Sequence, residues 1–240
     1  MANEAPPRGG GFLSGWKGAL LAAGIGILIG GGAMMAASGH FVRSYLLEHP
    51  EVLPEAIDRL HAREASQLVV ANRAAIETPF AGAWAGAKDG DVTLVEFFDY
   101  ACTFCRRSNA DVDRLLKEDP KLKVVWREWP VLGPDSEAAA RASLAAAQAG
   151  KFRPFHDSLY AAGRPTPEAL QKAQAAFGIA PLSPDAAKAE LGKNYQLANT
   201  LRASGTPTFV VGDRIFQGAV GYDALKGAIA EARRGGASAG

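Results

Sequence analysis

Two cysteines separated by two residues, Cys102 and Cys105, are the side chains of this chain best suited to chemistry. The chain has no other cysteine, so none remains for a structural disulfide elsewhere. Two thiols at this spacing can close a small ring and open it again with little movement of the backbone. The pair therefore predicts thiol-disulfide exchange, in which a thiolate attacks the sulfur of a disulfide bond.

The elements around the pair determine which thiol ionises. Residues 92–98 are apolar on both faces, which predicts a central buried strand. The chain turns helical at Thr103, and residues 122–129 form a second predicted strand, so the pair lies at the helix start of a βαβ unit. Because a helix N-terminus stabilises negative charge, we expect Cys102 to attack and Cys105, one turn further and more buried, to resolve the mixed disulfide.

Two other interpretations of the cysteine pair have less support. A structural zinc site needs four ligands, and the chain has no second cysteine pair. An inert buried pair is not expected at a helix start. His156 is expected to be a structural helix residue, and the four histidines lack the spacing of metal ligands: His40, His49, His61 and His156. The sequence therefore predicts neither a metal site nor a cofactor.

Thr206-Pro207 is a second candidate feature, because it immediately precedes a predicted strand at residues 208–211. Proline disrupts the interior of a strand, so this position indicates a special turn that is compatible with a cis peptide bond. Such a turn would expose the backbone of Thr206 for pairing with an extended client peptide. Taken alone, an ordinary proline at the start of a strand is the stronger interpretation.

Glu96 lies among apolar neighbours in the predicted central strand, six residues before Cys102. Burying a carboxylate is costly and would raise its pKa, which would suit the group to carry a proton to or from Cys105. An equally weighted alternative is a partly exposed residue that pairs with Arg127 on the next strand. Asp99 is expected to cap or turn the loop that follows the strand.

The N-terminal region predicts export. Residues 18–39 carry no charged side chain and are long enough to span a bilayer as a helix, and Arg8 and Lys17 precede them. This favours an uncleaved signal anchor over a signal peptide that is cut near residues 36–38.

The chain also has 26 basic and 25 acidic residues, a balance that argues against a nucleic-acid partner.

The predicted domain organisation follows from this segment. After the anchor, apolar spacings of three and four residues predict an amphipathic helical stalk that breaks near Pro50. Its apolar stripe could dock on the catalytic domain or form a homo-oligomer. The expected parts are a disordered cytoplasmic N-terminus at 1–17, the transmembrane anchor at 18–39, the stalk at 40–77 and a catalytic domain at 78–240.

The order of elements in the catalytic domain predicts an α/β fold. Residues 78–90 are expected to be a loop, and a block of helices covers about residues 136–204. A β-hairpin with Gly212-Asp213 at its turn and a last helix at 222–232 follow. This order predicts a thioredoxin fold with a helical domain inserted between the βαβ unit and the C-terminal β-hairpin plus helix.

Three ordered sequence blocks, at residues 95–106, 127–136 and 205–218, resemble the DsbA family of bacterial extracytoplasmic oxidoreductases. The resemblance covers about residues 78–232. Residues 45–53 also resemble the N-terminal extension of a membrane-anchored or oligomeric branch of that family. The resemblance implies the thioredoxin fold and redox activity at the cysteine pair.

The resemblance also implies roles for single residues. In that family, the proline that matches Pro207 is cis and lies against the cysteine pair, and the acid that matches Glu96 is buried beneath it. Thr206 and Pro207 are then expected to bind clients together with Thr103 and Phe104. Strongly oxidising members carry Pro-His between the cysteines, so Thr103-Phe104 implies a higher thiolate pKa and weaker oxidation.

The sequence therefore predicts an extracytoplasmic thiol-disulfide oxidoreductase that acts first of all as a dithiol oxidase on cysteine-containing exported proteins. The alternative is an isomerase or reductase kept reduced by a membrane electron donor, which an oligomeric stalk would favour. A non-redox chaperone or binding module is disfavoured by the intact motifs. The expected location is the inner membrane, as a single-pass protein with a periplasmic catalytic domain and a membrane redox partner, or the periplasm after signal cleavage.

Overall fold

The computed structural model describes residues 41–237 of the chain, with side chains up to residue 235. The predicted membrane segment at residues 18–39 lies outside this range. Among the residues that are described, no helix is both long enough and apolar enough to cross a bilayer. The chain divides into two compact units, residues 1–59 and 60–240, while the domain limits expected from the sequence remain a prediction.

The described part of the first unit is helical. One helix covers residues 41–48, and α2 (Val52–Glu77) begins after a turn at Pro50 and continues into the second unit. The predicted short helix, break and longer helix are therefore confirmed. Proline suits the break and the first helical turn, where a missing N–H costs no hydrogen bond. Several large apolar side chains are exposed here: Phe41, Val42, Tyr45, Leu47, Leu53 and Ile57.

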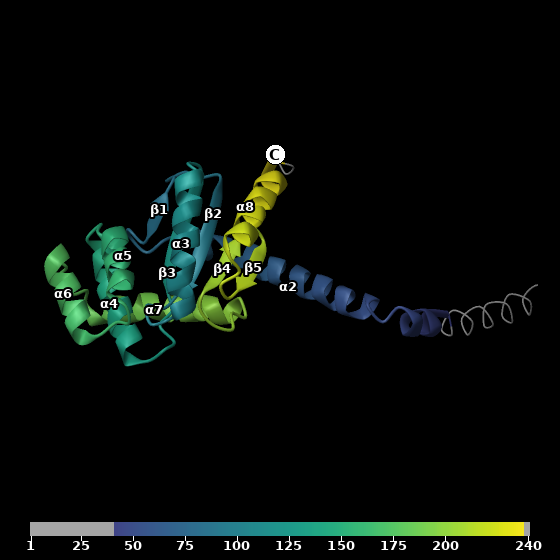
Figure 1. The fold of residues 1–240 in the computed structure, drawn as a ribbon, viewed down its shortest axis with the longest axis horizontal. Coiled ribbons are helices and arrows are strands. Elements are labelled where there is room, and N and C mark those ends of the chain that lie inside the picture. Colours follow the sequence, from purple (N-terminus) through teal and green to yellow (C-terminus); the bar gives the residue numbers. More distant parts are fainter. Residues whose placement is uncertain (1–40, 238–240) are drawn as a thin grey trace, which may run out of the picture. The chain divides into compact units, whose positions relative to one another are not determined.

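The second unit is built on a five-stranded sheet in the order β1-β3-β2-β4-β5 (Figure 1). Strand β2 (Val92–Phe98) pairs in parallel with β3 (Leu122–Glu128), and α3 (Thr103–Glu118) connects them. The predicted βαβ unit is confirmed. Strand β4 (Thr208–Val211) pairs with β2 and β5 (Arg214–Gln217) pairs with β4, both antiparallel.

Two glycines are required by the sheet. Gly212 starts the turn between β4 and β5 with a φ of 57°, a conformation that glycine adopts without steric cost. Gly86 ends β1 (Trp84–Gly86), where a Cβ atom would lie 2.2 Å from the carbonyl oxygen of Leu122. The prediction of a loop at residues 78–90 was wrong at β1. Three residues are too few to show the alternating pattern of a strand, and they form one only because they pair with β3.

Four helices separate β3 from β4, which confirms the predicted α/β class with an inserted helical block. Thr166 and Ser183 cap two of them, since their hydroxyl oxygens accept the N–H of Ala169 and Ala186. The last helix of this block ends at Thr200 rather than at the predicted residue 204, because Arg202 adopts a left-handed φ of 54° that ends a helix. The four are α4 (Pro134–Gln148), α5 (Phe152–Ala162), α6 (Pro167–Phe177) and α7 (Pro184–Thr200).

The sheet is covered on both faces, as the doubly apolar run in β2 predicts. On one face, Leu94 and Phe98 pack among α3, α4, α5 and the C-terminal helix α8 (Tyr222–Ala237). On the other face, Val95 and Phe97 pack against the C-terminal half of α2 and against α7. Burial of each such side chain stabilises the fold by roughly 1.5–3 kcal/mol. Figure 1 shows α3 and α8 side by side in front of the strands.

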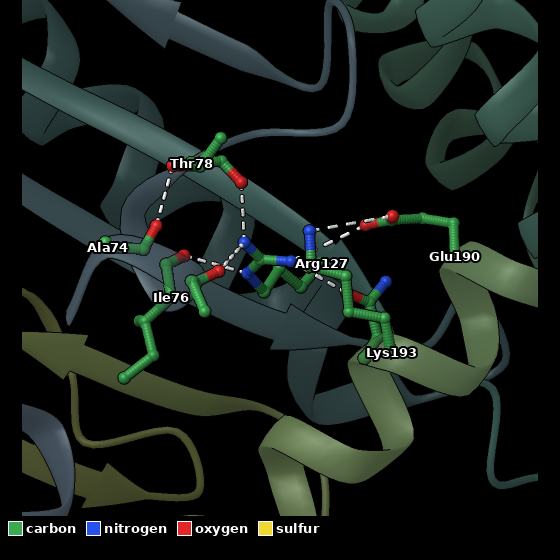
Figure 2. Close-up of polar contacts among 8 residues, drawn as sticks. Ala74, Ile76, Thr78, Arg127, Glu190 and Lys193 are labelled. Carbon is green, nitrogen blue, oxygen red and sulfur yellow. Dashed lines mark hydrogen bonds and ion pairs between the residues drawn. The ribbon is translucent and has the colours of Figure 1, made fainter. Parts of the chain in front are cut away.

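Arg127 joins β3 to the end of α2 (Figure 2). The last carbonyl groups of a helix have no partner within the helix, and this buried guanidinium supplies donors to them. It lies 3.5 Å from the Glu190 carboxylate. Its hydrogen bonds go to the carbonyl oxygens of Ala75, Ile76 and Thr78 and to Oδ1 of Asn194. The arrangement fixes the second half of α2 to the catalytic unit.

Candidate active site

Cys102 immediately precedes α3, and its sulfur caps that helix. The backbone N–H of Cys105 donates to the Cys102 sulfur over 3.4 Å. The backbone of Cys102 is extended, with φ −77° and ψ 117°, as is usual for a helix-capping residue. The partial positive charge of the helix start favours a thiolate at this place, as the sequence predicts.

The pKa of Cys102 is lowered from its ordinary value of 9.0 to about 5. The main cause is a hydrogen bond with the Cys105 thiol, and burial opposes the shift. Smaller contributions that also lower the pKa come from a hydrogen bond with Thr206 and from the backbone N–H groups of Phe104 and Cys105. A thiol with this pKa is largely ionised at neutral pH. The thiolate is therefore well stabilised without a histidine between the two cysteines.

Cys105 lies one helical turn further and is completely buried. Burial raises the pKa of Cys105 far above 9.0, and a hydrogen bond with Cys102 and the charge of Glu96 raise it further. Both cysteines are free thiols in the structure. The large difference in ionisation between the two thiols favours Cys102 as the attacking sulfur.

The loop before β4 brings Thr206 and Pro207 to the cysteine pair. The Cys102 sulfur lies 3.2 Å from the carbonyl oxygen of Thr206. The peptide bond between Thr206 and Pro207 is cis, which confirms that part of the prediction. The Thr208 hydroxyl lies 2.7 Å from the carbonyl oxygen of Gly205 and helps to hold the loop.

Glu96 is completely buried, on the face of β2 that also carries Phe98. It is in register with Trp126 on β3, whose indole N–H donates to Oε2 over 3.1 Å, while Oε1 has no partner among the described residues. Burial raises the pKa of Glu96 from 4.5 to about 8. The alternative prediction of an exposed pair with Arg127 is wrong, because adjacent strand residues point to opposite faces and Arg127 lies on the other one.

Replacing Glu96 by glutamine is expected to change how the stability of the reduced protein depends on pH. Between pH 4.5 and about 8 the folded protein holds a proton at this carboxyl that the unfolded chain has lost. Stability must therefore fall as the pH rises through that window, by roughly 2–4 kcal/mol. Urea unfolding should show Glu96→Gln gaining stability relative to the wild type between pH 5 and 8. A difference that stays constant over this range would contradict the raised pKa.

Asp99 holds the loop between β2 and the cysteine pair in place. Its carboxylate accepts the backbone N–H groups of Ala101, Val131 and Leu132 over 2.8–2.9 Å. Its carbonyl oxygen accepts the N–H of Cys102 over 3.1 Å. The sequence predicts a turn at Asp99, but its contacts with the loop after β3 depend on the pairing of the strands.

A buried polar cluster beneath this loop could not be found from the sequence. The Tyr100 hydroxyl lies 2.8 Å from Ser143 Oγ and 3.1 Å from Nδ1 of His156, and the Tyr160 hydroxyl donates to the Asp99 carbonyl over 3.2 Å. Burial lowers the pKa of His156, so the ring is neutral, and its place in the core agrees with the structural role expected of it. The helical block thus supports the cysteine loop from below.

The expected client-binding side chains at the start of α3 are accessible. Thr103 is exposed, and 53% of Phe104 is exposed. Cys102, Thr206 and the cis Pro207 lie together at the same end of the sheet because β2 and β4 are paired neighbours. The arrangement can present a stabilised thiolate beside the half-buried Thr206, and a second thiol and a protonated acid are buried nearby.

Comparisons with known proteins agree with this geometry. The model of the DSBA-like thioredoxin domain matches residues 93–230, and that of the copper resistance protein ScsC N-terminal domain matches residues 37–67. A thioredoxin-like oxidoreductase from Silicibacter pomeroyi DSS-3 is 37% identical, with a TM-score of 0.62 over 68% of this chain and 98% of that one. A linker-deletion variant of Proteus mirabilis ScsC is 28% identical and superposes with a TM-score of 0.68. The match covers 80% of this chain and 90% of the ScsC variant.

Curated relatives are longer proteins. The Na(+)/H(+) antiporter NhaA 3 of Salinispora tropica is 29% identical over 156 residues, which are 61% of this chain and 24% of the antiporter. The chain therefore spans about a quarter of the length of the curated relatives it matches. Because the matching domain model covers more than half of the sequence, the chain belongs to the DsbA-like thioredoxin domain family.

Proposed function

We propose that this protein is a dithiol oxidase that passes the disulfide of Cys102 and Cys105 to cysteine-containing exported proteins. The observation that carries the proposal is the stabilised Cys102 thiolate, with its pKa lowered to about 5 by hydrogen bonds at the start of α3. Stabilising the thiolate stabilises the dithiol form of the pair. The disulfide form of the pair is then less stable than the dithiol form, so transfer of the disulfide to a client is favourable.

In the proposed reaction, a client thiolate attacks the Cys102 sulfur of the Cys102–Cys105 disulfide. The bond between the two cysteines breaks, a bond from Cys102 to the client forms, and Cys105 leaves with the electron pair. Glu96 holds a proton near neutral pH, and its ionised form would raise the pKa of Cys105, so the two groups are close enough to interact and Glu96 is placed to protonate the leaving sulfur. A second client thiolate then attacks the client sulfur and releases Cys102 as a thiolate. The client has lost two electrons, and the cysteine pair has gained them.

Turnover requires an acceptor for those two electrons, for which we propose a membrane redox partner. The anchor at residues 18–39, its orientation and a periplasmic catalytic unit belong to the same proposal, and the charge-free sequence of that segment supports them. Alkaline extraction of membranes from cells that express the full chain tests the anchor. Release of a shortened soluble protein would instead indicate a cleaved signal peptide.

A second candidate function is disulfide isomerisation or reduction. The observation that favours it is the set of exposed apolar side chains between residues 41 and 60, in a region that matches the ScsC N-terminal domain. Such side chains favour association with further copies of this chain. An oligomer would present several cysteine pairs to one misfolded client, and a membrane electron donor would keep them reduced.

The reduction potential of the cysteine pair, measured in glutathione buffers, distinguishes the two functions. The low Cys102 pKa predicts a value above about −200 mV, closer to the −120 mV of a strong oxidant than to the roughly −270 mV of thioredoxin. Replacing Thr103-Phe104 by Pro-His serves as a comparison and should move the potential further in the oxidising direction. A value near −270 mV would favour the reductase or isomerase, and a pair that never exchanges would contradict both.

A further inference from the structure

A groove of about 380 Å³ opens beside Cys102, between the start of α3 and the loops on either side of the β4–β5 hairpin. Phe104 and Arg107 form one wall, and residues 204–206 and 217–219 form the other. Thr206 belongs to the second wall, and its carbonyl oxygen lies 3.2 Å from the Cys102 sulfur. A polypeptide that enters the groove therefore reaches Thr206, the residue that contacts the attacking sulfur.

Of the described residues that line the groove, Arg107 alone carries a charge. Its guanidinium carbon lies 5.0 Å from the centre of the Phe104 ring, a cation–π contact that holds the head group over the wall. Within the part of the chain that the structure describes, no carboxylate forms an ion pair with it. Asp111, four residues further along α3, is the acid best placed to do so by helix spacing, yet the two are not paired.

On the opposite wall, the longest polar side chain is that of Gln217, and its hydrogen bonds go to partners other than Arg107. The side-chain oxygen of Gln217 already accepts the Ser204 N–H over 3.1 Å and lies 3.0 Å from the Thr208 hydroxyl. The Gln217 amide donates to the Arg202 carbonyl over 3.4 Å. The planar guanidinium of Arg107 thus keeps its N–H donors available, in a geometry that matches a carboxylate.

We propose that this groove selects client segments with an acidic side chain close to the reacting cysteine, and that Arg107 pairs with that acid. The inference rests on the proposed function, because it names the class of clients. Arg107 follows Cys102 by five helical positions, or roughly 7 Å along the axis of α3. An extended client covers that distance in about two residues, so the acid should lie two positions from its cysteine.

The test uses short peptides with one cysteine blocked as a mixed disulfide with thionitrobenzoate, and the reduced full-length protein. Two peptides differ only in carrying glutamate or glutamine two residues from the cysteine. Stopped-flow release of the coloured thiol at low ionic strength measures the attack of Cys102 on each. We expect the glutamate peptide to react roughly 3- to 10-fold faster, a preference that should decrease with added salt.

Two variants assign the preference to the groove. Arg107→Gln should bring the ratio of the two rates to about one. Arg164→Gln removes an equal charge from an exposed loop of the helical block and should keep the ratio of the wild type. Equal rates in the wild type, or a preference that survives in Arg107→Gln, would overturn this inference while leaving the proposed function intact. A protein that reacts with neither peptide would count against the proposed function itself.

Discussion

Replacing Cys102 by serine is expected to reduce disulfide exchange to background, a loss of roughly 10³-fold or more in rate. The serine hydroxyl stays protonated at neutral pH and cannot form a disulfide, so neither attack on a client nor transfer to one is possible. Exchange with a chromogenic model disulfide measures this loss. Activity near that of the wild type would contradict the assignment of Cys102 as the attacking group.

Cys105→Ser is the matched control, because its effect should have the opposite signature. The serine keeps a hydroxyl that can donate to the Cys102 thiolate, which replaces the main contact that lowers the Cys102 pKa. Attack therefore persists, but no second thiol is present to resolve the product. Mixed disulfides with client proteins should accumulate and be visible on non-reducing gels. Their absence, together with adducts in Cys102→Ser, would reverse the two assigned roles.

Replacing Arg127 by methionine is expected to lower the free energy of unfolding by about 3–5 kcal/mol. The change removes the donors to three carbonyl groups at the end of α2 and leaves the buried Glu190 carboxylate with Lys193, 4.0 Å away, as its remaining cation among the described residues. An apolar residue can replace a buried ion pair at little cost, but here the carbonyl groups would remain without partners. Urea denaturation of the reduced protein at pH 7 measures the loss.

Arg141→Met is the control for loss of an arginine as such. Arg141 forms an exposed pair with Glu137 within α4, and such pairs contribute less than about 1 kcal/mol. The two variants should therefore differ by several-fold in their effect on the free energy of unfolding. A cost below about 1 kcal/mol for Arg127→Met would show that water or a shifted side chain replaces its hydrogen bonds.

Elements with strong local patterns could be predicted from the sequence. Strand β2 is apolar on both faces and has the predicted limits, and the long helices of the inserted block follow their capping residues and prolines. The environment of Glu96 could not be decided in advance, because it depends on the register that sets Glu96 opposite Trp126. The same register turns Arg127 toward α2, a partner 49–52 residues away in the chain.

The site combines one local motif with several distant contacts. The cysteine pair and its place at the start of α3 can be read from a short stretch of sequence. Thr206 lies 104 residues from Cys102, and only the pairing of β2 with β4 brings them together. Residue spacing alone therefore left Pro207 as an ordinary strand-start proline, and the family resemblance was needed to connect it with the cysteines.

The inserted helices differ in how freely their sequences can change. Ser143 of α4 and His156 and Tyr160 of α5 contact the loop that carries the cysteine pair, through Tyr100 and Asp99. Helix α6 packs on α4 and α5, but none of its side chains forms a hydrogen bond with that loop in the described structure. We therefore expect the exposed surface of α6, rather than the residues of α4 and α5 that hold this loop, to accept sequence changes without moving the reactive sulfur.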